Sequence, residues 1–126
     1  MRIRINEDEK SFLTESAFLL KEMGKLEEAK NTFKGLIALF PESDLPYVGY
    51  AEVLMAERKL NEAELFLKET LEKFSYSELV NFHLGEISLL KGDVEKAREF
   101  FEKKIYKNLK GAAQDYLKFI ENLNKK

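Results

Sequence analysis

The feature of this chain that most constrains its fold is an alanine that recurs every 34 residues: Ala29, Ala63 and Ala97. A second set of small residues recurs at the same interval: Ala17, Ala51 and Gly85. Large apolar residues lie three positions before and four positions after each alanine, which places them on one helical face with it. Two antiparallel helices approach closely only where their side chains are small. The pattern therefore predicts three helix-turn-helix units, in which the first small residue of each unit packs against the second.

The chain has 126 residues, which is the length of one domain. A single helix hairpin cannot bury its apolar face, whereas stacked hairpins share a continuous core. Residues 112–126 form one further amphipathic pattern without a partner helix, and we expect it to cap the last apolar face. The sequence thus predicts an all-α fold, an α-solenoid of three helix-turn-helix repeats with a C-terminal capping helix.

Capping and turn residues predict where the helices begin and end. Asn6 is expected to cap the first helix, whose first turn is acidic. Gly24 and Gly92 suit the turns inside the first and third units, and Ser75 and Glu78 have the spacing of a capping box at the start of the third. The predicted helices before the cap span about 7–23, 26–40, 45–57, 60–74, 77–90 and 94–107.

Composition excludes several classes of protein. There are no cysteines, so disulfide frameworks and thiolate metal sites are excluded. Charged residues make up 35% of the chain but sum to only −2, which favours neither a nucleic-acid partner nor a membrane. There is no run of about 20 apolar residues. We expect a cytoplasmic location. The local basic run Lys103, Lys104, Lys107 and Lys110 is interpreted as a solvated helix end.

Candidate catalytic groups are few. His83 is the one histidine, and Glu86 lies three residues after it on the same expected helix, with Glu52 on the preceding unit. A metal site or an acid–base pair is the functional interpretation of these residues, and a polar pair on a helix surface is the simpler one. The six glycines are too far apart for a phosphate-binding loop. The sequence predicts no enzyme activity, no catalytic residues, no metal and no cofactor.

The 34-residue period with a small residue in each helix resembles the tetratricopeptide repeat (TPR) family. The resemblance covers residues 10–111 as repeats 10–43, 44–77 and 78–111. Residues 1–9 form an N-terminal arm and helix start, in which 1–6 are expected to be flexible or strand-like, and residues 112–126 form the cap. The chain departs from the family at the fourth repeat position, where a large aromatic residue is usual and Leu13, Tyr47 and Asn81 stand here.

In TPR proteins the first helices of successive repeats line a concave groove, so the resemblance implies a partner-binding groove here. Its expected lining residues are Phe18, Leu45, Val48, Gly49, Glu52, Met55, Leu79, Phe82, His83, Glu86 and Leu89. Apolar residues predominate among them in the second and third repeats, with Phe82 as the central aromatic. The expected partner is therefore an amphipathic helix or an extended apolar segment of another protein. Gly49 marks the close approach of a ligand backbone, close helix packing, or a glycine that the helix simply tolerates.

One well-known TPR activity does not fit these residues. Members that clamp the acidic C-terminus of heat-shock proteins use Lys, Asn and Arg side chains at positions held here by Thr14, Phe18, Gly49, Leu79 and His83. None of the five supplies the cationic, amide-rich site that a carboxylate requires.

Two classes of function remain. The first is a small adaptor or chaperone that holds a partner segment in its groove, and the chain resembles the small TPR chaperones of type III secretion in length and repeat number. The second is a structural scaffold or self-associating subunit of a larger complex, in which case the chain forms a homo-oligomer.

Overall fold

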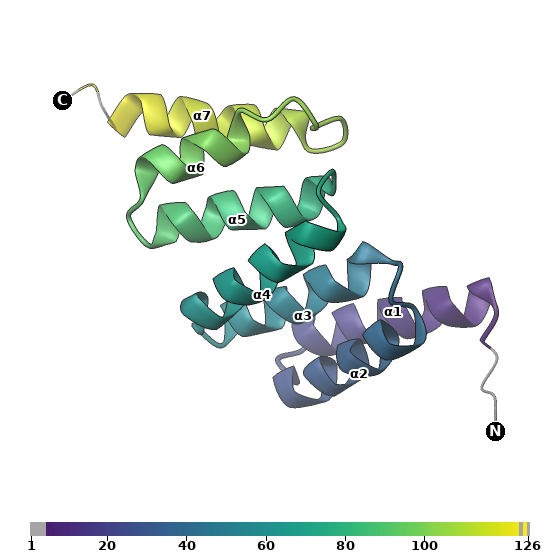
Figure 1. Cartoon of the computed structure of the whole chain (residues 1–126). Coiled ribbons are helices and arrows are strands. Elements are labelled where there is room, and N and C mark those ends of the chain that lie inside the picture. The colour runs from purple at the N-terminus through teal and green to yellow at the C-terminus, as the bar shows by residue number, and fades with distance from the viewer. Residues whose placement is uncertain (1–4, 124, 126) are drawn as a thin grey trace. The chain divides into compact units, whose positions relative to one another are not determined.

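The computed structural model describes residues 5–123 and 125 (Figure 1). These residues form seven α-helices: α1 (Glu7–Glu22), α2 (Leu26–Leu39), α3 (Asp44–Ala56), α4 (Leu60–Lys73), α5 (Glu78–Leu90), α6 (Val94–Phe101) and α7 (Lys110–Leu123). The all-α prediction is confirmed, and five of the six predicted helices before the cap agree with the structure to within about two residues. Most of the arm predicted for residues 1–6 lies outside the described residues.

The chain divides into two compact units, Met1–Lys59 with α1 to α3 and Leu60–Lys126 with α4 to α7. The division falls in the turn between α3 and α4, inside the repeat predicted for residues 44–77. The repeat boundaries therefore stay a prediction, and we describe each unit separately.

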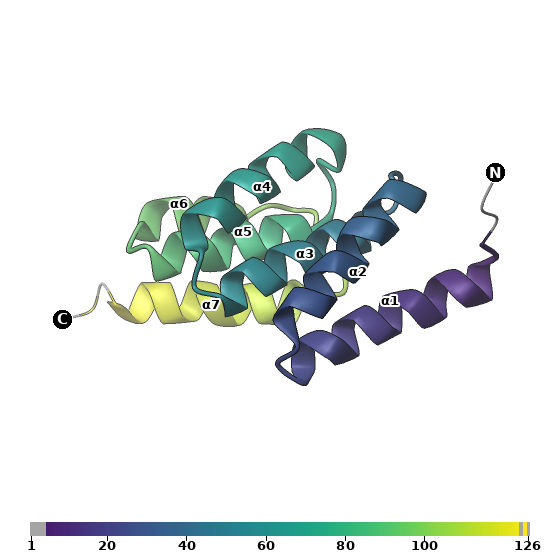
Figure 2. The same ribbon diagram turned by 90° about the horizontal axis from the view of Figure 1, so that it is seen from below.

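The first unit is built on α2, which packs against both α1 and α3 (Figure 2). Ala17 of α1 and Ala29 of α2 are fully buried in one apolar cluster with Phe33 and Val53, as the small-residue pattern predicts. α1 begins as predicted, because the side chain of Asn6 accepts a hydrogen bond from the backbone N–H of Glu9 at 2.8 Å.

Each unit contains a phenylalanine ring that lies against a helical glycine. A Cβ atom built at Gly49 of α3 would lie only 2.2 Å from Cε1 of Phe33, and one built at Gly85 of α5 would lie 2.7 Å from Cζ of Phe101. A methyl group at either position would overlap the ring, so any residue other than glycine forces the ring to move. Close packing therefore explains Gly49, and the approach of a ligand backbone does not. At Gly85 the three nearest atoms belong to Phe101, and the predicted partner Ala97 is fully buried in the same cluster as that ring.

Replacing Gly49 with alanine should destabilise the protein, because the ring of Phe33 is fully buried and cannot move aside freely. We expect an overpacking cost of about 1–3 kcal/mol in the free energy of unfolding, measured by chemical denaturation. Gly35→Ala is the matched control, since a Cβ at Gly35 of α2 meets nothing within 4 Å. Alanine there should stabilise the exposed helix by up to about 1 kcal/mol. Equal midpoints for the two variants would contradict the ring-on-glycine packing.

The second unit differs from the prediction at the end of α6. The helix ends at Phe101 instead of continuing to residue 107, and residues 102–109 form turns that lead into α7. Tyr106 explains the change, because its side chain is buried and its hydroxyl donates to the carbonyl of Phe100 at 2.9 Å. The ammonium of Lys103 donates to Oδ1 of the buried Asn81 at 2.6 Å. Lys103 is exposed, as predicted, but it lies in the turns after the helix and is bonded to Asn81.

Glu78, at the first position of α5, holds these turns in place. Its carboxylate accepts hydrogen bonds from the backbone N–H groups of Lys107 at 2.6 Å and Leu109 at 3.0 Å, just before α7 begins. The hydrogen bond from Leu109, together with those from the backbone of Lys107 and Asn108, lowers the pKa of Glu78 below its usual value. The N-cap of α5 lies two residues later than predicted. The side chain of Ser77, and not that of Ser75, accepts a hydrogen bond from the backbone N–H of Val80.

Replacing Glu78 with glutamine should reduce stability in a pH-dependent way. A carboxyl group whose pKa is lowered by folding stabilises the native state above its unfolded-state pKa, and this contribution is lost as pH falls through the folded-state pKa. We expect the parent to be more stable than Glu78→Gln at neutral pH, with a gap that closes as pH falls below about 4.5. Thermal unfolding of both proteins between pH 3 and pH 7 measures the gap, and a gap independent of pH would contradict this role.

Candidate protein-binding surface

In the first unit, the predicted groove residues lie on α1 and α3, and several of them are not open to a partner. Val48 and Gly49 are buried. Phe18 is half-buried, with its ring edge-on to Phe33 at a centroid distance of 4.9 Å. Leu45 is exposed, and it borders a hollow of about 270 Å³ between α1 and the start of α3. The other lining residues of this hollow are Glu7, Lys10, Ser11, Thr14, Glu15 and Ser43.

Glu52 forms an ion pair in the first unit. The ammonium of Lys21 on α1 donates to Glu52 on α3 at 2.5 Å. Burial lowers the pKa of Lys21, but hydrogen bonds and attraction from Glu52 and Glu22 outweigh it, so the pKa of Lys21 lies above its usual value. Lys21 and Glu52 therefore tie α1 to α3 as a charged pair.

In the second unit, the predicted central anchor Phe82 lies in the core. Only 9% of its surface is exposed, and its ring packs edge-on against Phe101, Tyr106 and Tyr116 at centroid distances of 5.5, 6.4 and 5.5 Å. Tyr116 comes from α7 and also stacks on Phe101 at 4.6 Å. The prediction that Phe82 presents an open aromatic anchor is corrected, because α7 supplies the ring that covers it.

His83 and Glu86 belong to a hydrogen-bonded network that links α5 to α7. Nδ1 of His83 lies 2.7 Å from Oε1 of Glu86, and the hydroxyl of Tyr116 donates to Oε2 of Glu86 at 2.7 Å. Burial, helped by the bond to Glu86, raises the pKa of Tyr116 to about 12. Within the described part of the chain, no three histidine or carboxylate side chains cluster as metal ligands would. The simpler interpretation of His83 and Glu86, a polar pair, fits this arrangement.

An apolar hollow of about 370 Å³ lies on α7, on residues that were not predicted to bind. Ala112, Asp115, Tyr116 and Phe119 line it, and Phe119 is 50% exposed. The sequence analysis misses these residues because it assigns residues 112–126 only a capping role. The repeat period offers a signal, since Tyr116 follows Phe82 by the same 34 residues that separate the alanines. Tyr116 of α7 therefore stands at the repeat position that Phe82 holds on α5, and it packs against Phe82.

The remaining predicted residues are half-buried. Met55 lies near the end of α3, Leu79 and Leu89 lie on α5, and Leu89 packs against the apolar cluster beneath α7. In the described residues, no helix combines the length and the apolar character needed to cross a membrane.

Truncating Phe82 to alanine should destabilise the second unit, because the side chain lies in an aromatic cluster. We expect a loss of about 3–5 kcal/mol in the free energy of unfolding, measured by urea denaturation. Phe119→Ala on α7 is the control, since half of that side chain is already exposed. It should cost about 1 kcal/mol or less. If Phe82→Ala were as stable as the control, the assignment of Phe82 to the core would be wrong.

Comparison with known proteins identifies the repeats. A tetratricopeptide repeat model matches residues 20–75, and a second model of the same repeat matches residues 80–106. A search of curated proteins finds no match.

Several solved structures have a similar fold. SycD, the translocator chaperone of Yersinia enterocolitica, is 21% identical, with 98% of this chain and 100% of that chain covered at a TM-score of 0.78. PcrH from Pseudomonas aeruginosa is 18% identical, with 94% and 96% covered at a TM-score of 0.77. The first TPR of Spaghetti (RPAP3), solved with an HSP90 peptide, is 14% identical, with 99% and 100% covered at a TM-score of 0.72. At these identities the likeness establishes the fold alone.

Proposed function

Since this chain belongs to the tetratricopeptide repeat family, we propose that it is a non-enzymatic protein-binding module that holds an apolar or amphipathic segment of a partner. The proposed binding surface is the first-helix face of each unit: α1 and α3 in the first, α5 and α7 in the second. In the second unit its open part lies on α7 around Tyr116 and Phe119.

The observation that carries this proposal is the hollow on α7. Two aromatic side chains, Tyr116 and Phe119, border it with Ala112, and the exposed half of Phe119 is available to a partner. The aromatic cluster beneath it, with Phe82 and Phe101, holds Tyr116 in one position. A rigid aromatic surface gains more from binding an apolar side chain than a mobile one, because less side-chain entropy is lost.

The solved relatives support a segment-binding role. SycD has been solved in complex with a peptide of the translocator YopD, and PcrH with the chaperone-binding region of PopD. We propose the corresponding narrower role for this chain, a chaperone of a type III secretion translocator. We also propose that this chain acts in the cytoplasm, as expected from the sequence.

The recognition chemistry differs from that of a heat-shock protein clamp. The RPAP3 domain has been solved with the HSP90 peptide SRMEEVD. At the positions that form the clamp, this chain has Thr14, Phe18, Gly49, Leu79 and His83. The ring of Phe33 packs against Gly49, so the space beside Gly49 is already filled. We therefore propose that apolar anchors, and not a terminal carboxylate, are recognised.

A photo-crosslinking experiment tests this surface. A photoreactive phenylalanine analogue is placed at Phe119 and, as the control, at the exposed Lys68 of α4, and each protein is expressed in its native cell. We expect a discrete adduct with one partner protein at position 119 and none at position 68. Because the contact is apolar, the complex should survive a severalfold rise in salt.

Circular dichroism of both labelled proteins confirms that they are folded. Equal adducts at the two positions, or an adduct that disappears when salt is raised before irradiation, would contradict an apolar site on α7.

A further inference from the structure

The two hollows on the proposed binding surface both have an acid beside their apolar side chain. We name them the α1–α3 hollow, which Leu45 borders, and the α7 hollow, which Phe119 borders. Glu7 and Glu15 line the α1–α3 hollow. Asp115 lines the α7 hollow and is the one charged side chain among its lining residues in the described part of the chain. All three acids are exposed, so their charges are open to a partner.

Glu15 and Asp115 differ from an acid on the same surface that has a structural role. Glu52 of α3 forms an ion pair with Lys21 and so ties α3 to α1. In contrast, no hydrogen bond or ion pair joins the carboxylate of Glu15 or Asp115 to another described residue. Packing within the unit therefore does not account for either of these charges.

In the described residues, the bases near the two hollows form no ion pair with these acids. Lys10 lines the α1–α3 hollow, but its ammonium lies over the ring of Phe40, 5.0 Å from the centroid. Lys118 is the nearest base to Asp115 along α7, three positions later. The helix dipole favours acids in the first turn of a helix, but Glu15 and Asp115 lie beyond that turn in α1 and α7.

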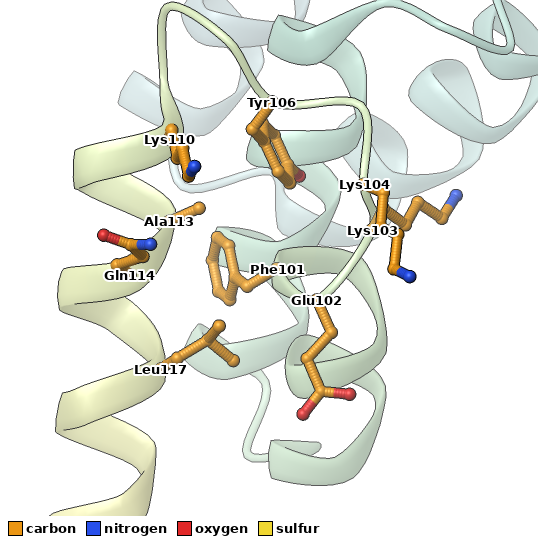
Figure 3. Close-up of a pocket in the computed structure, with 9 residues that line it drawn as sticks. All are labelled: Phe101, Glu102, Lys103, Lys104, Tyr106, Lys110, Ala113, Gln114 and Leu117. Carbon is orange, nitrogen blue, oxygen red and sulfur yellow. The ribbon is translucent and has the colours of Figure 1, made fainter.

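A third hollow, of about 350 Å³, lies between the turns after α6 and the side of α7 (Figure 3). It shares no lining residue with the α7 hollow. Glu102 and Lys110 line it with opposite charges. The ammonium groups of Lys103 and Lys104 lie on the side of the turns away from α7 (Figure 3). The third hollow therefore favours neither charge in a partner, unlike the two hollows of the proposed binding surface.

A charge at the rim of an apolar hollow acts on the residues beside the side chain that enters it. A carboxylate attracts lysine and arginine and repels aspartate and glutamate. Such an ion pair stays exposed to water, so one pair changes affinity by about fivefold at most. The apolar contact therefore supplies most of the affinity, and the rim charge supplies selectivity between partners.

We propose that each of the two hollows selects a basic amphipathic segment of a partner protein. An apolar side chain of the segment enters the hollow. A lysine or arginine beside it pairs with Glu15 at the α1–α3 hollow or with Asp115 at the α7 hollow. The aliphatic stem of such a base packs along the apolar side chains of the hollow while its charge stays in water. This inference rests on the proposed function and adds the charge of the segment that is held.

A peptide selection followed by a charge swap tests this preference. Random peptides displayed on phage are selected on the parent protein. The most enriched peptide is then synthesised with a twin in which glutamates replace its lysines and arginines, and fluorescence anisotropy measures both dissociation constants. We expect the enriched peptides to place lysine or arginine beside apolar residues. We expect the twin to bind about tenfold more weakly, because attraction becomes repulsion.

Glu15→Lys and Asp115→Lys identify the hollow that selects the charge. Glu102→Lys is the matched control, because it makes the same charge change at the third hollow. All three acids are exposed, so the variants should fold like the parent, which circular dichroism checks. A peptide held at the α7 hollow should lose its preference over the twin in Asp115→Lys, and one held at the α1–α3 hollow should lose it in Glu15→Lys. Both peptides should bind the control as they bind the parent.

The outcomes separate this inference from the proposed function. Apolar peptides enriched without lysine or arginine, or a twin that binds as tightly as the selected peptide, would overturn the inference and leave the proposed function standing. A preference that neither Glu15→Lys nor Asp115→Lys reduces would do the same. Enrichment of peptides without apolar residues, or of no peptide, would contradict the proposed function, and the inference would fall with it.

Discussion

A phenylalanine ring packed against a helical glycine is the contact on which the rest of the packing in each unit depends. Phe33 lies on Gly49 in the first unit and Phe101 on Gly85 in the second, and in both cases a Cβ would overlap the ring. Each ring then supports further aromatic packing, Phe18 in one unit and Tyr116 in the other. The two glycines cost helix propensity, about 1 kcal/mol each relative to alanine. The aromatic contacts that they allow offset this cost.

The helices were largely predictable from the sequence, because the signals for them are local. A period of 34, turn residues such as Gly24 and Gly92, and the Asn6 cap act through neighbours in the chain, and the structure has helix ends where they indicate. The end of α6 was not predictable in this way. It depends on Tyr106 and on the distant Glu78, whose hydrogen bonds reach residues that lie about 30 positions further along the chain.

The candidate site was harder to predict than the fold, because it also depends on contacts between residues that are far apart in the sequence. Family geometry placed Phe82 and Val48 on an open face, and both are buried. For Phe82, the cause is α7, whose Tyr116 covers it and whose Phe119 takes the exposed position. A prediction from helix spacing alone cannot state which of two aromatic layers is outermost, because that depends on how a helix 34 residues later packs. The groove residues that remain half-buried, such as Met55 and Leu79, keep their predicted role as a proposal.

The central claim is that a partner segment contacts the outer aromatic layer of α7 while the inner layer stays packed. Fluorine NMR of protein labelled with 4-fluorophenylalanine measures this directly, because each of the ten phenylalanines gives its own signal. When the crosslinked partner segment is added, we expect the signal of Phe119 to shift, while those of Phe33, Phe82 and Phe101 stay unchanged. Shifts of Phe82 and Phe101 with no change at Phe119 would show that the partner enters the core instead, and would contradict the account.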